Sequence, residues 1–319
     1  MENRCFIKKI GITILLITSL LSNCQQNNTN PKKEQMQTII PKEKQITYAV
    51  HINAMTPYEL YLDDILIDFF YRDNMNTTVE LNPYLLENGT HKLKIRYLPP
   101  TDSPDGFLNP KDIIFNKDAK WDLYFVKLNK DPNVPLGYTN EIDYGSSELK
   151  IIAPPTKLPF WEQEWDLDIK DLPYKLKGWS ESEDLSKMDK DLLEKEVVTF
   201  FDNQRNLLNE GKIEEYLNLC KNEDYELDIC TYTTEEQSKI DYQDNLELMS
   251  KLCFNNMQPI NNYEVRLFAN GKLITLLIPT GKFKNWSALM SITPKGRNNY
   301  YRILLHKPRG LNHFEIIRK

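Results

Sequence analysis

The chain has 319 residues, of which 40% are hydrophobic and 11% aromatic, as is typical of a globular protein. Its net charge at pH 7 is −6, and this acidic balance argues against general binding to nucleic acid. The sequence lacks G-x-S-x-G, H-E-x-x-H and G-x-G-x-x-G motifs and a phosphate-binding glycine loop. No cofactor is therefore implied, and binding is expected rather than catalysis.

The first 23 residues have the pattern of a lipoprotein signal peptide. Basic side chains precede an apolar stretch from Ile10 to Leu21, which is shorter than the roughly 20 residues of a membrane-spanning helix but typical of a secretory signal. Its end, Leu21-Ser22-Asn23-Cys24, resembles the bacterial lipobox. The resemblance implies lipidation of Cys24, palmitate included, and anchoring to the cell envelope. Gln25 in place of Asp favours the outer membrane over the inner one. An ordinary cleaved signal is the alternative.

The exported part begins with a segment that has little to bury. Residues 24–45 are rich in Gln, Asn, Lys and Pro, which predicts a disordered tether. The remaining residues, about 270, suffice for two domains. Removal of residues 1–23 leaves 37 basic and 45 acidic side chains, a net charge of −8. In an oxidising periplasm Cys220 and Cys230 could form a disulfide, or all three remaining cysteines could be half-buried thiols near helix ends.

The first domain, residues 46–168, is expected to be a β-sandwich of jelly-roll or Ig-like type. Short β-rich segments separated by turn residues indicate this architecture. They cover residues 46–54, 58–64, 76–82, 91–99, 120–128 and 148–155. The stretch from Tyr58 to Tyr97, with "YLDDILID" and "NPYLLENGTHKLKI", is similar to galactose-binding-type jelly rolls. That likeness implies the sandwich architecture and no sugar site.

Residues 169–186 are predicted to be an acidic linker, and residues 187–319 an α+β domain. Apolar residues from Leu193 to Leu208 recur at helical spacing up to Gly211, and a second short helix is expected over residues 213–220. A third helix is expected to begin at a capping box, Thr233 to Glu236. Its predicted buried residues are Ile240, Leu246, Met249 and Cys253.

The end of the chain has the pattern of an antiparallel sheet. Asn270-Gly271 lies between two β-rich runs and predicts a hairpin, because both turn positions favour a positive φ. Further strands are expected over residues 287–292, 300–306 and 313–319. This order of helices and strands is similar to the cone-shaped NTF2-like fold.

Two stretches carry candidate small-molecule sites. "WEQEWDLD" places Trp161 and Trp165 among four carboxylates, which could form a carbohydrate platform. An edge strand or linker that packs its tryptophans gives the same pattern. The neighbouring aspartates lack the loop glycine of an EF-hand-type turn, so no metal site is expected. Arg309 lies between His306 and His313, in either a functional cluster or a solvated turn.

Charge is segregated along the second domain. Residues 200–254 have a net charge of −8, and residues 263–319 a net charge of +9. These charges could attract each other internally, or the basic part could face an acidic protein partner through Lys282, Lys284 and Arg309. We therefore expect a lipid-anchored, non-enzymatic protein-binding module. Immunity proteins that neutralise toxins are one group of such modules. The alternatives are a carbohydrate-binding surface lipoprotein and a hydrolase with a pocket in the second domain.

Overall fold

A computed structural model describes residues 39–72, 74–99, 121–129, 141–142, 147–152 and 158–318. The signal peptide, Cys24 and most of the predicted tether lie outside the described residues. Residues 37–319 belong to one compact unit. Within the described residues, the single-turn 3-10 helices are η1 (Lys42–Lys44), η2 (Asn82–Tyr84), η5 (Leu185–Lys187) and η6 (Gly281–Phe283).

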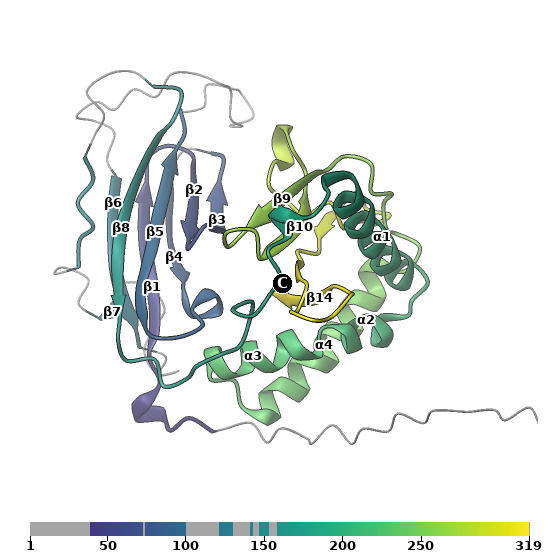
Figure 1. The fold of residues 1–319 in the computed structure, drawn as a ribbon, viewed down its shortest axis with the longest axis horizontal. Helices are drawn as coiled ribbons and strands as arrows, with labels where there is room; N and C mark the ends of the chain where they lie inside the picture. The colour runs from purple at the N-terminus through teal and green to yellow at the C-terminus, as the bar shows by residue number, and fades with distance from the viewer. Residues whose placement is uncertain are drawn as a thin grey trace, which may run out of the picture. The chain divides into compact units, whose positions relative to one another are not determined.

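The first part of the described chain contains two four-stranded antiparallel sheets (Figure 1). One has the order β4 (Met75–Glu80), β1 (Thr47–Ala54), β6 (Trp121–Leu128) and β7 (Glu141–Ile142). The other has the order β3 (Ile65–Phe70), β2 (Tyr58–Leu62), β5 (Gly89–Tyr97) and β8 (Trp161–Ile169). Side chains from both sheets meet in one apolar core, which confirms a sheet-rich first part. In the predicted strand 148–155, residues 148–152 make only one isolated bridge, from Glu148 to Tyr124, and residues 153–155 lie outside the described residues.

Four helices follow: α1 (Lys190–Asn209), α2 (Ile213–Leu219), α3 (Lys221–Thr231) and α4 (Glu235–Cys253). Asp189 caps α1 by accepting a hydrogen bond from Leu192 N, and Gly211 follows its end with a φ of 76°. The first two helices confirm the apolar periodicity. α4 is capped by Thr234, one residue later than predicted. Ile240 is 47% exposed rather than buried, because the first half of α4 is mostly exposed.

The chain ends in a four-stranded antiparallel sheet of order β14 (Glu315–Arg318), β13 (Leu304–His306), β10 (Leu273–Leu277) and β9 (Glu264–Phe268). A small hairpin of β11 (Met290–Ile292) and β12 (Asn298–Tyr300) accompanies it. The β9–β10 hairpin is confirmed. β10 is buried on both faces: Ile274 and Leu276 join the helices in a second core, while Leu273 and Leu277 join the core of the first sheets.

The segment predicted as an acidic linker carries apolar side chains into the first core. Leu172, Tyr174, Leu176 and Trp179 are all buried there. Backbone hydrogen bonds tie it on both sides, from Leu176 N to Leu86 O at 2.7 Å and from Glu183 N to Lys307 O at 2.9 Å. The segment therefore packs between the first sheets and the last one.

Candidate functional site

A buried carboxylate connects the first sheets to the loop that follows β10. Glu59 of β2 accepts hydrogen bonds from the hydroxyls of Tyr61 and Tyr71, each at 2.7 Å, and from Lys284 Nζ at 2.8 Å. Burial alone would raise the pKa of Glu59, but Lys284 and the tyrosine hydroxyls outweigh burial and lower the pKa to about 2. Lys284, predicted to bind a partner, is therefore committed to an internal ion pair.

The same loop contributes Phe283 and Trp286 to an aromatic patch, which we define as Phe69 of β3, Phe283, Trp286 and Tyr300 of β12. The ring centroid of Trp286 lies 5.7 Å from that of Phe69 and 4.8 Å from that of Tyr300. The rings of Tyr300 and Phe283 are 5.5 Å apart. Trp286 is nevertheless 44% exposed. An exposed tryptophan supported by other rings is typical of an interaction hot spot.

Cations accompany the aromatic patch. Residues 281–300 contain Lys282, Lys284, Lys295 and Arg297 and no acidic residue. Lys282 is exposed, and its ammonium lies 5.6 Å from the ring centroid of Phe283. Arg309 is also exposed, but its backbone N–H donates to Glu181 O at 3.0 Å, and none of its contacts within the described ranges reaches the patch. The structure thus places Lys282 beside the patch.

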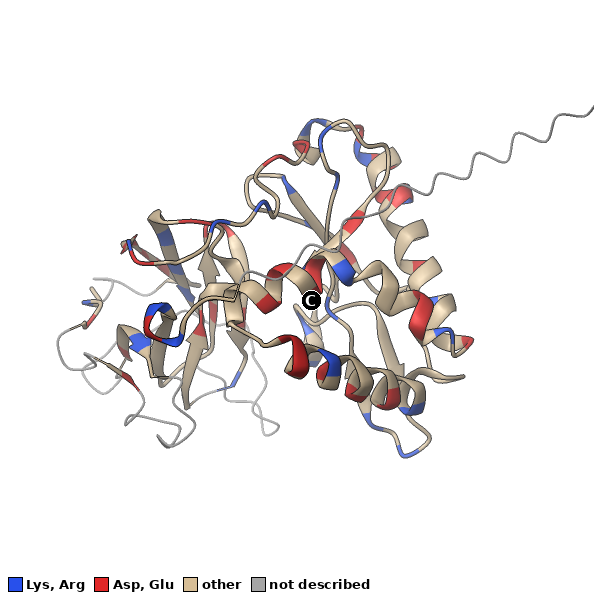
Figure 2. Cartoon of the chain, turned by 90° about the horizontal axis from the view of Figure 1, so that it is seen from below, with Lys and Arg blue, Asp and Glu red and all other residues tan. Residues whose placement is uncertain are grey.

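Part of the predicted charge segregation is neutralised internally. Acidic residues recur along the helices (Figure 2). Arg318 pairs with Glu226 of α3 at 3.0 Å, and Lys307 pairs with Glu196 of α1 at 3.4 Å. Arg318 thus pairs with the acidic segment 200–254 and Lys307 with Glu196 just before that segment, while the side chains of Lys282, Lys295 and Arg297 are exposed.

The tryptophans of β8 are separated from its carboxylates. Strand geometry places Trp161 and Trp165 on one face, where both pack against the first core. The acidic residues alternate onto the other face, where Glu162 pairs with Arg96 at 2.7 Å and Glu164 with Lys92 at 3.3 Å. Because β8 is the edge of its sheet, this geometry matches the edge-strand interpretation of the sequence better than a carbohydrate platform.

The disulfide suggested between Cys220 and Cys230 is not formed, and the described part of the chain also contains no cluster of metal-ligating side chains. The sequence indicated a polar loop between these cysteines, but the intervening residues form α3. At 1.5 Å per residue the two cysteines lie about 15 Å apart along the helix, well beyond the roughly 7 Å limit for a disulfide. Burial raises the pKa of the Cys230 thiol to about 12.

One serine and one histidine have the spacing of a nucleophile and its base. Ser182 Oγ lies 2.8 Å from His306 Nδ1, and Glu315 lies 4.0 Å from His306 Nε2. Both Ser182 and His306 are buried, and burial lowers the pKa of His306 to about 4. His313, by contrast, is exposed. This arrangement fits a structural contact between the 179–185 segment and β13 rather than a catalytic site.

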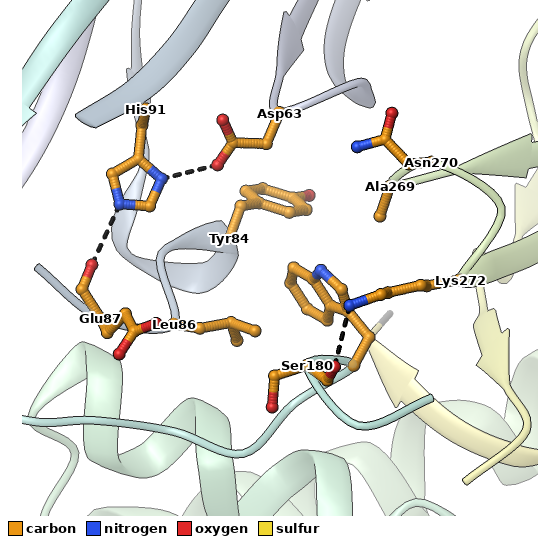
Figure 3. A pocket seen from close by; sticks show the side chains of 10 residues that line it. Asp63, Tyr84, Leu86, Glu87, His91, Ser180, Ala269, Asn270 and Lys272 are labelled. Atoms are coloured by element: carbon orange, nitrogen blue, oxygen red, sulfur yellow. Dashed lines mark hydrogen bonds and ion pairs between the residues drawn. The ribbon is translucent and has the colours of Figure 1, made fainter. Parts of the chain in front are cut away.

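A pocket of about 240 Å³ lies where three distant segments meet (Figure 3). The first sheets and η2 contribute Asp63, Tyr84, Leu86, Glu87 and His91, the 179–185 segment contributes Trp179 and Ser180, and the β9–β10 turn contributes Ala269, Asn270 and Lys272. Its floor includes the buried Trp179 and Ala269, and its rim includes the exposed Glu87, Ser180 and Asn270. The pocket is thus open to solvent and lined by aromatic and polar groups.

His91 fixes one wall of this pocket. Its Nδ1 lies 2.6 Å from Asp63 Oδ2 and its Nε2 lies 3.0 Å from Glu87 O, and both partners accept hydrogen bonds (Figure 3). Burial alone would lower the pKa of His91, but the hydrogen bond to Asp63 and its charge outweigh burial and raise the pKa. Only the imidazolium can donate to both oxygens. A charged His91 therefore joins the β2–β3 turn to the loop before β5.

The opposite wall depends on a glycine. Gly178 has a φ of 46°, and a Cβ at this position would lie 2.4 Å from Leu86 Cδ2. The absence of a side chain lets the chain approach Leu86 and place Trp179 in the wall. Arg318 supports the Trp179 ring, with its guanidinium carbon 5.1 Å from the ring centroid. Lys272 Nζ donates to Ser180 O at 2.8 Å and joins this wall to the β9–β10 turn (Figure 3).

Comparisons of the chain with protein-family models, with curated proteins and with solved structures found no match. Among the helices that the structure describes, none combines the length and the apolar character that crossing a membrane requires.

Proposed function

We propose that this protein is an exported lipoprotein, attached to the bacterial envelope through Cys24, whose folded part is a non-enzymatic module that binds another protein. The basic start, the apolar stretch and the lipobox-like Leu21–Cys24 support the anchor. The folded part is a β-sandwich followed by an α+β domain. The shared core of the two first sheets supports the sandwich.

The observation that carries the protein-binding function is the exposure of Trp286 within a fixed aromatic patch. Ile278 N donates to Trp286 O at 2.8 Å, and Trp286 N donates to Phe283 O at 3.0 Å. Asn285, buried and with a φ of 64°, donates to Glu59. These bonds fix the backbone, and Phe69 and Tyr300 pack against the ring. Because Trp286 is held in this way, it loses little conformational entropy when a partner covers it.

The surrounding charge indicates the kind of partner. The loop and hairpin of residues 281–300 carry only basic charges. An acidic protein surface would complement them, and this attraction would mainly accelerate association. A secreted toxin or another envelope protein with an acidic face is a partner of this kind.

Photocrosslinking in intact cells tests this proposal. A photoreactive aromatic amino acid at position 282, beside the aromatic patch, should yield one discrete crosslinked protein. The same amino acid at position 239, where Lys239 is exposed on α4, is the matched control and should not yield it. Equal crosslinking from both positions, or a product that persists undiminished in Trp286→Ala, would contradict a binding surface at the patch.

The alternative, a carbohydrate-binding lipoprotein, loses support at Trp161 and Trp165, which pack against the core away from the carboxylates. The pocket beside Asp63 and Trp179 supports carbohydrate binding independently of these two tryptophans.

A further inference from the structure

We infer that the pocket beside Asp63 and Trp179 binds one neutral sugar residue, at a site that shares no lining residue with the aromatic patch. Its volume is about 240 Å³. Pockets for drug-sized ligands are larger, at about 300–1,000 Å³. A single ring with its hydroxyl groups fits this space, and the exposed rim allows the sugar to be the end of a longer glycan.

The pocket combines the two kinds of group that a sugar needs. Trp179 and Tyr84 supply aromatic surface against which the C–H groups of a sugar ring can pack. Hydroxyl groups both donate and accept hydrogen bonds, and the lining offers both functions. Asp63 accepts, Lys272 donates, and the exposed amide of Asn270 does both.

The charges of the lining favour a neutral ligand. Two carboxylates, Asp63 and Glu87, are balanced by Lys272 and the imidazolium of His91. The charge of Asp63 is already compensated, since Oδ1 accepts from Lys92 N at 2.8 Å and Oδ2 accepts from His91 at 2.6 Å. Each oxygen has a further lone pair for a hydroxyl group. The negative charge that would attract an ammonium ligand is already paired with the His91 imidazolium.

The walls are ordered before a ligand arrives. The hydrogen bonds of His91 connect the β2–β3 turn to the loop before β5 in one wall. The hydrogen bond from Lys272 to Ser180 O connects the β9–β10 turn to the 179–185 segment, and the Arg318 guanidinium packs against Trp179. A pocket with such fixed walls loses little entropy when it is filled. The three segments are distant in sequence, which is why the sequence alone did not indicate the site.

Ligand-observed NMR on the complete mature protein tests this inference. The probes are glucose, galactose, mannose and N-acetylglucosamine. The competitors are glucuronic acid, an anion of similar size, and alanine, a smaller zwitterion. At least one neutral sugar should bind saturably. Asn270→Ala and Lys272→Met should each weaken that binding roughly fivefold, as expected for the loss of one hydrogen bond. Lys295→Met, a substitution at an exposed lysine outside the pocket, is the matched control and should not change it.

Three results would overturn the inference: no saturable binding of any neutral sugar, preferential binding of glucuronic acid or alanine, or sugar binding unchanged in both pocket variants. Circular dichroism confirms that each variant is folded. Crosslinking at position 282 is read independently, so failure of the sugar site and failure of the protein-binding proposal are distinguishable.

Discussion

Replacement of Lys284 by Met should destabilise the fold much more than replacement of Lys282 by Met. The sequence suggested that both lysines lie in a loop where a charge change disturbs little. In the structure, however, Lys284 is the closest cation to the buried Glu59, and its side chain is only 29% exposed. Without it, a carboxylate inside the protein loses its main compensating charge.

The expected loss can be estimated in two ways. Removal of one partner of a buried ion pair costs about 3–5 kcal/mol. The pKa of Glu59 falls from 4.5 to about 2, and at about 1.4 kcal/mol per pKa unit the charged form is stabilised by about 3 kcal/mol net of the cost of burial. Because Tyr61, Tyr71 and Arg96 remain, about 2–3 kcal/mol is expected for Lys284→Met. Lys282→Met should cost less than about 1 kcal/mol.

Urea unfolding at pH 7 and pH 3 measures both the size and the origin of the loss. A group whose pKa is lowered by folding contributes its stability above its unfolded pKa and loses it as pH falls through the folded pKa. The difference between wild type and Lys284→Met should therefore be full above pH 4.5 and shrink toward pH 2. Equal losses for the two lysine variants at pH 7, or a loss for Lys284→Met that is the same at pH 3, would refute the ion-pair explanation.

Four further results are expected. Cys24→Ser should leave the protein uncleaved or release it from the membrane fraction, and a variant that is cleaved yet still pellets after a salt wash would exclude the lipid anchor. Limited proteolysis of the mature protein should cut before residue 39 and spare residues 169–186, whose apolar side chains are buried; early cleavage there would show that the segment does not pack. Folding raises the pKa of His91, so its stabilising effect should be full below the unfolded pKa and disappear as pH rises through the folded pKa. Urea unfolding from pH 5 to pH 9 measures the stability difference between wild type and His91→Gln. This difference should fall as pH rises, and an increase would contradict the role of His91. Cys220, Cys230 and Cys253 should react with a thiol reagent only after unfolding, and all three should then react without reductant; a single reactive thiol would indicate a disulfide.

Local patterns in the sequence were sufficient for several elements. The apolar residues of α1 recur at helical spacing, and Asn270-Gly271 marks the β9–β10 hairpin, where Ala269, Asn270 and Gly271 all have a positive φ. α3 was missed because its only buried residues are Glu223 and Cys230, which form no apolar stripe.

The candidate sites were harder to predict because their residues are distant in the chain. Glu59 and Lys284 are 225 positions apart, and neither flanking sequence indicates that they meet. Trp179 stands in an acidic stretch typical of a linker. Its packing depends on the neighbouring Gly178, which lets the chain approach Leu86 of a distant segment. The exposed Trp286 lies in a loop whose lysines the sequence marks as candidates for partner binding. The rings that support Trp286 come from β3 and β12, which are distant from this loop in the sequence or follow it.

The most direct test of the central claim uses the partner protein that crosslinking at position 282 captures. Its affinity is measured for the purified wild type, for Trp286→Ala and for Leu248→Ala. Leu248 is the matched control, since it is a large apolar residue that is 54% exposed on α4. Loss of a hot-spot tryptophan costs at least about 2 kcal/mol, so Trp286→Ala should weaken binding roughly 30-fold, with a further salt-dependent loss in Lys282→Glu. Leu248→Ala should bind as wild type does. Equal affinity of Trp286→Ala and wild type would contradict the assignment of the aromatic patch as the binding surface.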